Sequence, residues 1–148
     1  KPVILSSGMS SMPEIMRALD ILTSHGSKIT LVHCVSIYPC PPSKLNLNTI
    51  RFFKKGFPNF KIGFSDHSLS TFAPCLDVAM GAEVIEKHFT LSRKDGEVDS
   101  AFSLEPVEMQ LLVNETERAW NAIGKTSPAS LLSRWPAIWA LSCRTKHS

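Results

Sequence analysis

Two short segments of the chain each end an apolar run in a histidine that stands two positions after a serine or an acid. The segment FSDH ends at His67, and the segment IEKH ends at His88. Because side chains alternate along a β-strand, Ser65 would share a face with His67, and Glu86 would share a face with His88. If the two strands are neighbours, the two imidazoles converge, and with open coordination positions they suit a divalent ion such as Mn, Co, Fe or Zn.

A third polar cluster follows another apolar run, at Ser36 and Tyr38. The same alternation places these two side chains together and points His33 to the opposite face, so we expect His33 to be structural. Polar side chains at the carboxyl ends of strands are typical of sites in parallel α/β folds. The three clusters therefore predict one site at one end of a sheet.

Each of these residues also has a purely structural interpretation. An isolated histidine on a strand is more often a core or surface group than a ligand. Glu86 could accept a hydrogen bond behind the site or pair with Lys87 in the interior, and the acidic loop that contains Asp99 is typical of a solvated segment. Spacing alone thus predicts a metal site and specifies no reaction.

A strand followed by a helix repeats four times along the chain, and these elements must position the side chains described above. Short apolar runs predict strands over 3–6, 29–34, 61–65 and 83–89. Helical spacing predicts a first helix that begins at a capping box over 11–14 and stops at Gly26. Three further helices are predicted over 48–57, 70–81 and 106–123. Pro74 lies inside the third of these helices, and the three prolines of the loop after residue 35 argue against helix there.

The alternation of strands and helices predicts an α/β fold with a parallel sheet. Near-continuous apolar strands fit a sheet that is covered on both faces. Periodicity does not separate an open doubly wound sheet from a (β/α)8 TIM-barrel type, but four units would be only half of such a barrel.

Composition excludes several classes of protein. The chain has 148 residues, 43% of them hydrophobic and 20% charged, which is typical of a globular protein with one domain. A net charge of +3 is too small to indicate nucleic-acid binding, and no apolar run approaches the roughly 18 residues of a membrane span. Four cysteines without CxxC spacing favour a reduced, cytoplasmic setting.

The two ends of the chain differ from the rest. The sequence begins without methionine and inside a strand pattern, so we expect a fragment of a larger domain. Residues 125–148 contain no acidic residue and two of the three tryptophans. We therefore expect residues 1–124 to form a partial (β/α) barrel domain and residues 125–148 to be a divergent, disordered or non-native tail.

Several separate motifs together resemble one enzyme family. KPVILSSGM, LVHCVSIYPCPP, IGFSDHS, GAEVIEKHFTL and SLEP, in this order and spacing, resemble the N-acetylneuraminate (sialic acid) synthase family over residues 1–124. The resemblance implies a (β/α)8 barrel followed by a small antifreeze-like domain. It also implies condensation of phosphoenolpyruvate with an N-acylated amino sugar such as N-acetylmannosamine, giving a nonulosonic acid and phosphate. A divalent metal, Mn, Mg or Co, is the implied cofactor.

The resemblance also assigns roles to individual residues. His67 and His88 match the two metal-ligand histidines, and Ser65 matches a residue that helps to bind phosphoenolpyruvate. Tyr38 and Glu86 match residues that line the site, with Glu86 a candidate for handling water or its proton. A metal held by two imidazoles can polarise the aldehyde of an open-chain sugar.

Three further positions complete the comparison with the family. Asp99 matches a loop aspartate that holds sugar hydroxyls. Ser36 stands where the family usually has asparagine, so a hydroxyl replaces an amide. Ser100 stands where the family usually has histidine, within a loop that usually reads Gly-Pro-Asp-His.

The resemblance places this chain at strands five to eight of the barrel. The lysines that grip phosphoenolpyruvate belong to the first four strands, so we expect this piece to be inactive alone and its full-length parent to be a homodimer. Two alternatives are a synthase that uses another sugar acceptor and a non-catalytic remnant that docks on an intact synthase. We expect no nucleic-acid or membrane partner.

Overall fold

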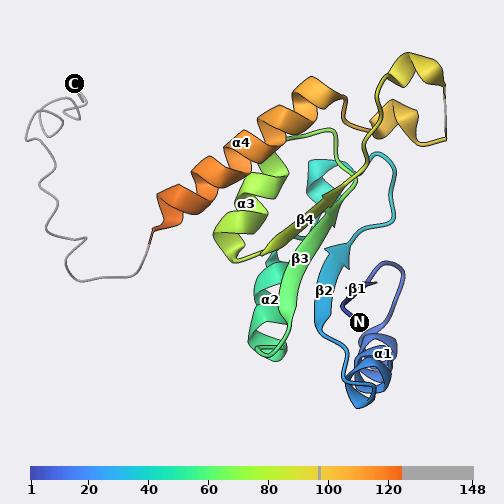
Figure 1. Cartoon of the computed structure of the whole chain (residues 1–148), viewed down its shortest axis with the longest axis vertical. Coiled ribbons are helices and arrows are strands. Elements are labelled where there is room, and N and C mark those ends of the chain that lie inside the picture. The colour runs from blue at the N-terminus through green and yellow to red at the C-terminus, as the bar shows by residue number, and fades with distance from the viewer. Residues whose placement is uncertain (97, 125–148) are drawn as a thin grey trace, which may run out of the picture.

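The computed structural model describes residues 1–96 and 98–124, and the expected tail over 125–148 lies outside these residues. A single four-stranded sheet has the order β1-β2-β3-β4, and each neighbouring pair is parallel (Figure 1). The strands are β1 (Val3–Ser6), β2 (Ile29–Cys34), β3 (Lys61–Asp66) and β4 (Val84–Lys87). Sequence order equals spatial order, as in one half of a (β/α)8 barrel, so the predicted fold class is confirmed.

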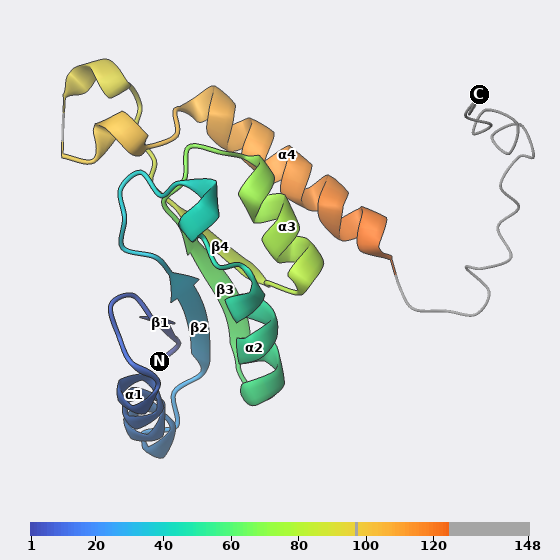
Figure 2. The same ribbon diagram turned by 180° about the vertical axis from the view of Figure 1, so that it is seen from behind.

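Helices follow the strands, and the first three of them pack against one face of the sheet (Figure 2). They are α1 (Met12–Ser24), α2 (Asn48–Gly56), α3 (Phe72–Met80) and α4 (Pro106–Ile123), with short 3-10 turns at Pro42–Lys44, Arg93–Asp95 and Ser100–Phe102. Within the residues that the structure describes, no helix is both long and apolar enough to cross a membrane.

The helix starts follow the sequence signals. At the start of α1, the Glu14 carboxylate accepts hydrogen bonds from the Ser11 backbone N–H at 2.7 Å and from the Ser11 hydroxyl at 2.6 Å. These bonds lower the pKa of Glu14. Pro74 does not interrupt α3 because it lies in the first turn, where a backbone N–H has no helical partner to lose.

The core lies between the helices and one face of the sheet. Its largest fully buried apolar side chains are Leu31 of β2, Ile50 of α2, and Ile62 and Phe64 of β3. The opposite face of the sheet is called here the barrel-facing side. On this side, Gly63 of β3 lies between Val32 of β2 and Val84 of β4. A Cβ at Gly63 would lie 2.6 Å from the Val84 carbonyl oxygen and 2.9 Å from Val32 Cγ1, so this position requires glycine.

Four local expectations need correction. The strand expected over 83–89 ends at Lys87, because the chain beyond Lys87 pairs with Leu104 instead of continuing along β3. Leu104 N donates to the His88 carbonyl at 2.9 Å, and Thr90 N donates to the Leu104 carbonyl at 3.0 Å. The strand expected over 61–65 continues to Asp66. The helix expected over 48–57 ends one residue earlier, and the helix expected over 70–81 is shorter, Phe72–Met80.

The prediction that the proline-rich loop after β2 contains no helix is wrong, because one turn of 3-10 helix forms there. Pro42–Lys44 forms a 3-10 turn with Pro42 at its first position, where the missing N–H costs no hydrogen bond.

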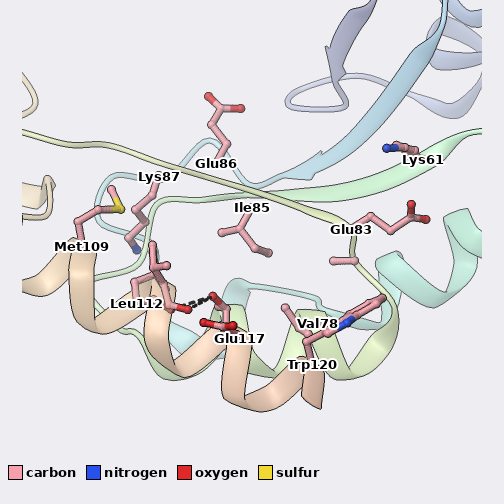
Figure 3. A pocket seen from close by; sticks show the side chains of 13 residues that line it. Lys61, Val78, Glu83, Ile85, Glu86, Lys87, Met109, Leu112, Glu117 and Trp120 are labelled. Carbon is pink, nitrogen blue, oxygen red and sulfur yellow. Dashed lines mark hydrogen bonds between the residues drawn. The ribbon is translucent and has the colours of Figure 1, made fainter. Parts of the chain in front are cut away.

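A groove of about 910 Å³ separates β4 from α4. In Figure 3, Ile85 of β4 points into this groove toward Leu112 of α4, whereas Glu86 points to the other side of the strand. Helix α4 makes its contacts mainly with α3, so its apolar stripe stands away from the sheet. Among the strands of the described residues, β1 and β4 are the outer two, and each pairs with one neighbouring strand.

Candidate metal and substrate site

Three rings from three different loops meet at the carboxyl end of the sheet. Tyr38 follows β2, His67 follows β3 and His88 follows β4. The ring centroids of His67 and His88 are 5.2 Å apart, and the Tyr38 ring lies 4.2 Å from that of His67 and 5.9 Å from that of His88. The strands β3 and β4 are direct neighbours, and this adjacency brings the two histidines together.

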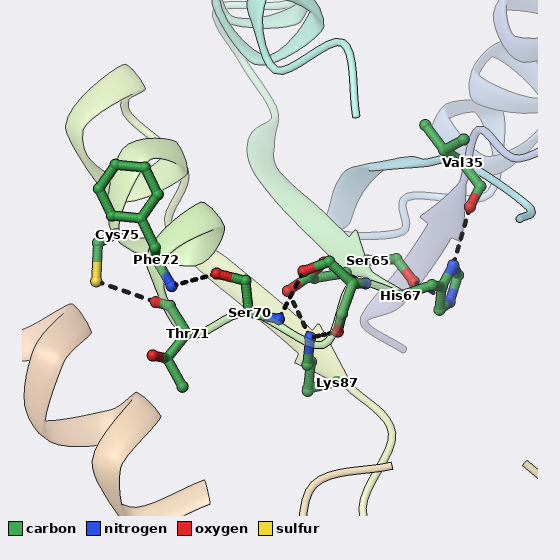
Figure 4. A network of polar contacts seen from close by, with 10 residues as sticks. Val35, Ser65, His67, Ser70, Thr71, Phe72, Cys75 and Lys87 are labelled. Carbon is green, nitrogen blue, oxygen red and sulfur yellow. Dashed lines mark hydrogen bonds and ion pairs between the residues drawn. The ribbon is translucent and has the colours of Figure 1, made fainter. Parts of the chain in front are cut away.

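The imidazole of His67 is held in a defined orientation. Its Nδ1 lies 3.1 Å from the Val35 carbonyl oxygen, an acceptor, so the Nδ1–H donates and the lone pair is on Nε2 (Figure 4). The Ser65 hydroxyl lies 3.4 Å from that Nε2, and Cys34 Sγ lies 4.0 Å from Nδ1. A carbonyl that fixes the tautomer of a histidine is the arrangement that metal-binding histidines use.

The ring of His88 is less enclosed. Phe102 packs edge-on against it at 5.2 Å, and Asp99 Oδ2 lies 3.8 Å from its Nδ1. That separation is too long for a hydrogen bond, but it places a carboxylate on the side of the ring away from Nε2. The 3-10 turn Ser100–Phe102 therefore supplies one wall of the site.

The loop after β2 carries Tyr38 over His67 and is fastened to β3. Cys40 N donates to the His67 carbonyl at 2.8 Å, which links this loop to the turn that holds the histidine. Burial of its hydroxyl, with the nearby Cys34, Asp99 and Glu86, raises the pKa of Tyr38, while a hydrogen bond with Ser36 lowers it. With a raised pKa, Tyr38 stays a neutral phenol that can donate a hydrogen bond to a substrate.

A buried ion pair ties together the ends of β3 and β4. Lys87 Nζ lies 2.6 Å from Asp66 Oδ2, and both side chains are almost fully buried. Asp66 Oδ1 also accepts from Ser68 N at 2.8 Å, and Lys87 donates to the Ser68 carbonyl. Because Asp66 directly precedes His67 and Lys87 directly precedes His88, this pair fixes the spacing of the two histidines. Lys87 thus pairs with Asp66 and not with Glu86.

The remaining predicted residues surround this cluster. Ser65 is buried on the barrel-facing side and lies in register with Glu86 on the neighbouring strand, where the Glu86 side chain is exposed. Ser36 is half-buried, with its hydroxyl 3.9 Å from Cys34 Sγ. Asp99 approaches the cluster at His88, and it also lies near the Tyr38 hydroxyl. The structure therefore brings Tyr38, His67, His88 and Ser65 together, with the others at the margin.

His33 lies on the helix-facing side, as expected for a structural residue. Its Nε2 is 2.8 Å from the Leu45 carbonyl oxygen, and its ring stacks on Phe64 at 5.8 Å. Burial lowers the pKa of His33, although the Leu45 carbonyl opposes this.

A lowered pKa in the folded state makes His33 a source of acid sensitivity. Below about pH 6.5 the unfolded chain binds a proton that folded His33 resists, so stability falls with falling pH, by at most about 1.4 kcal/mol per pH unit for one group. We expect the stability of His33→Gln relative to wild type to rise as the pH falls from 7 to 5, measured by urea unfolding at each pH. A difference between the two proteins that does not change with pH would contradict a lowered pKa of His33.

The donor set fits a metal in part. His67 offers Nε2 and His88 lies beside it, but within residues 1–96 and 98–124 no group of three or more His, Cys, Asp or Glu side chains is placed to hold an ion. Two imidazoles suit an open site at which water or substrate supplies the other ligands, and do not suit a closed structural site.

Sequence reasoning missed three contributors to this site. Phe102 packs on both Tyr38 and His88, and no motif identified it because its contact depends on how the loop after β4 folds back. The buried Asp66–Lys87 pair was hidden because each residue looks solvent-exposed in a polar motif. Cys34 could have been found, since strict alternation places it on the same face as Ser36 and Tyr38.

Comparisons with known proteins point to one family. The model of the NeuB family matches residues 1–128. An uncharacterized protein of Methanocaldococcus jannaschii is 45% identical over 125 residues, which are 84% of this chain and 37% of that protein. The N,N'-diacetyllegionaminic acid synthase of Campylobacter jejuni is 39% identical over 127 residues, which are 84% of this chain and 38% of the synthase.

A solved structure shares the fold. The N-acetylneuraminic acid (sialic acid) synthetase of Leptospira borgpetersenii superposes with a TM-score of 0.81 and 39% identity, covering 97% of this chain and 50% of that chain. The chain thus spans well under half the length of the curated relatives and half of the solved one.

Proposed function

This chain belongs to the NeuB family, and from that premise we propose that it provides the metal-binding half of a synthase that condenses phosphoenolpyruvate with an N-acylated amino sugar. The product would be a nonulosonic acid, with release of phosphate. We further propose that its four units are strands five to eight of the barrel, so that the lysines that grip phosphoenolpyruvate lie in the other half.

One observation carries the proposal: His67, His88 and Tyr38 converge at the carboxyl ends of adjacent parallel strands. In barrels of this type, that end is where active sites are built. The tautomer imposed on His67 by the Val35 carbonyl and the buried Asp66–Lys87 pair both support a prearranged site, since each restricts where an imidazole nitrogen can point.

Each residue would have a distinct task. His67 and His88 would hold a divalent ion such as Mn, Mg or Co, which supplies Lewis-acid polarisation of a carbonyl when bound. Ser65 would orient an anionic group of phosphoenolpyruvate, and Tyr38 would donate a hydrogen bond from its neutral phenol. Glu86 is exposed on the barrel-facing side, where its carboxylate could accept a proton from water.

The acceptor sugar is a separate question. Relatives of similar identity are called N,N'-diacetyllegionaminic acid synthase, pseudaminic acid synthase and N-acetylneuraminate-9-phosphate synthase, which differ in their sugars. Asp99 would hold sugar hydroxyls, while Ser36 and Ser100 replace larger polar groups of the family pattern. These replacements favour a second candidate function, a synthase of the same type with a different acceptor. The same departures are also compatible with the third candidate, a non-catalytic piece that docks on an intact synthase.

Metal binding by the 148-residue chain tests this proposal without requiring turnover. Calorimetric titration with MnCl2 should show about one ion per chain. The double variant His67→Ala, His88→Ala should lose at least about tenfold in affinity, because even residues behind a metal ligand typically contribute that much.

His25→Ala is the matched control, since His25 lies at the exposed end of α1, far along the chain from both strand ends. It should bind as the wild type does. A chain that is folded by circular dichroism but binds no Mn, or a double variant that binds normally, would contradict the proposal. We expect no synthase turnover from this chain alone, and product formation from purified chain would show that this half is sufficient.

A further inference from the structure

The two histidines of the site are held in different ways. The Val35 carbonyl oxygen lies 3.1 Å from Nδ1 of His67, and this contact fixes the tautomer and the direction of that ring. Within residues 1–96 and 98–124 the ring of His88 forms no hydrogen bond, and the carboxylate oxygen beside it, on Asp99, is 3.8 Å from Nδ1. The orientation of the His88 ring therefore depends on packing, above all against Phe102, whose ring lies 5.2 Å away.

Phe102 and Asp99 both belong to the loop between β4 and α4 (Figure 1). The two ends of this loop are joined where Leu104 pairs with the chain that follows β4. This pairing closes the base of the loop. It leaves the turn Ser100–Phe102, which supplies one wall of the site, to be held by other contacts.

Arg93 makes the contacts that hold this turn. Its Nε donates to the Ser103 carbonyl at 3.0 Å, directly after the turn, and its backbone N–H donates to Glu105 Oε1 at 2.9 Å. Its Nη2 donates to the Glu108 carboxylate in the first turn of α4. The Ser103 hydroxyl in turn donates to the Asp99 carbonyl at 2.8 Å. One arginine thus links the start of α4 to the segments on both sides of the turn.

The chemistry of arginine suits this task. The guanidinium presents its N–H donors in one rigid plane, so it can donate to the Ser103 carbonyl and the Glu108 carboxylate at the same time. The Arg93 and Glu108 side chains are 33% and 40% exposed, so the ion pair itself contributes little to the stability of the fold. Arg93 is therefore placed to control where the turn lies, more than whether the chain folds.

From these contacts we infer that Arg93 is a positioning residue for His88 and acts through Phe102. The inference rests on the proposed function, because His88 would be the second ligand of the metal. Arg93 does for His88 what a backbone carbonyl does for His67, since it limits the directions in which the imidazole can point. Phe102 also lies 5.3 Å from the ring of Tyr38, so the same turn restricts the phenol.

NMR of the metal-free 148-residue chain tests the positioning directly. The wild type should show nuclear Overhauser contacts from the ring of Phe102 to the rings of His88 and Tyr38. Arg93→Met should lose these contacts, because the turn is no longer tied to α4. The contact between the rings of Tyr38 and His67, which lie 4.2 Å apart, should remain in both proteins, since neither residue belongs to the loop. A general loosening of the fold would not spare that contact.

Arg118→Met is the matched control. Arg118 forms an ion pair of the same kind with Glu115, at 2.7 Å, about three turns of α4 beyond Glu108. This variant loses an arginine and an ion pair on the same helix without touching the loop. It should keep every ring contact of the wild type, and circular dichroism checks that each variant is folded.

Calorimetric titration with MnCl2 tests the consequence for metal binding. Arg93→Met should bind Mn about three- to tenfold more weakly than the wild type, a smaller loss than for a direct partner of a ligand, because Arg93 acts through Phe102. Phe102→Ala should lower the affinity at least as much, since it removes the wall itself. Phe102 is only half-buried, so this variant should fold even if Arg93→Met does not. Arg118→Met should bind as the wild type does.

The outcomes separate this inference from the proposed function. A wild-type chain that is folded but binds no Mn contradicts the proposed function, and the ring contacts in Arg93→Met then decide the inference alone. Ring contacts of Phe102 that survive in Arg93→Met overturn the inference. If the wild type binds Mn, the inference is also overturned by an unchanged affinity of Arg93→Met or of Phe102→Ala.

Discussion

Replacing Lys87 with methionine should destabilise the chain by about 3–5 kcal/mol, measured by urea unfolding at pH 7. Lys87 and Asp66 lie 2.6 Å apart with side chains 2% and 0% exposed, so the replacement leaves a carboxylate in the interior without its partner. The Ser68 carbonyl also loses a charged donor. A loss of this size is a large fraction of the stability of an ordinary domain.

Two controls separate this effect from the loss of any lysine. Lys54→Met breaks the half-exposed contact with Glu83 and should cost no more than about 1 kcal/mol. The double variant Asp66→Leu, Lys87→Met removes both charges and should be more stable than Lys87→Met alone. If Lys87→Met and Lys54→Met cost the same, the buried pair does not stabilise the fold as described.

The second large effect concerns Asp77, which is fully buried on α3. Within the described residues, neither carboxylate oxygen of Asp77 has a hydrogen-bond partner. Burial, with a smaller contribution from Asp66, raises the pKa of Asp77 to about 8. The folded chain therefore keeps a proton that the unfolded chain releases near the ordinary value of 3.8.

The sign of the pH dependence follows from proton binding. Between these two pKa values the folded state binds more protons, so Asp77 makes stability fall as pH rises, at a slope of up to about 1.4 kcal/mol per pH unit. The loss is complete above about pH 8 and amounts to several kcal/mol. Asp77→Ala should be the more stable protein at pH 8 and should lose this slope.

Urea unfolding of both proteins from pH 5 to pH 9 measures the difference. Asp20→Ala is the matched control, because Asp20 is exposed on α1 and should leave the slope unchanged. Parallel stability curves for wild type and Asp77→Ala would show that Asp77 is ionised in the folded chain, through a partner outside the described residues or through water.

The fold was predictable from the sequence because its signals are local. The capping box at Ser11 and Glu14, the apolar strand runs and the proline at the start of α4 each fixed an element to within a few residues. Strict alternation along β3 and β4 was enough to place His67 with Ser65 and His88 with Glu86. Neighbouring parallel strands then brought the two histidines together.

The features that sequence reasoning missed depend on contacts between segments that are distant in the sequence. The end of β4 at Lys87 follows from pairing with Leu104, which no local pattern announces. Asp66, Lys87 and Asp77 are ordinary surface residue types, and only the packing of α3 and α4 around them shows that they are buried. The assigned roles of His67, His88, Ser65, Tyr38, Glu86, Ser36 and Asp99 all stay predictions, because they depend on how the site binds a metal ion and substrates.

The most direct test of the central claim is the response of the histidine side chains to Mn. In 15N-labelled chain, substoichiometric Mn should broaden the imidazole resonances of His67 and His88 first, since these rings lie 5.2 Å apart and would share the ion. His33, buried on the opposite face of the sheet, should broaden only after these two, and His25, at the end of α1, should keep a sharp signal. Broadening of His25 before His67 and His88, or equal broadening of all four, would contradict a metal site at the ends of β3 and β4.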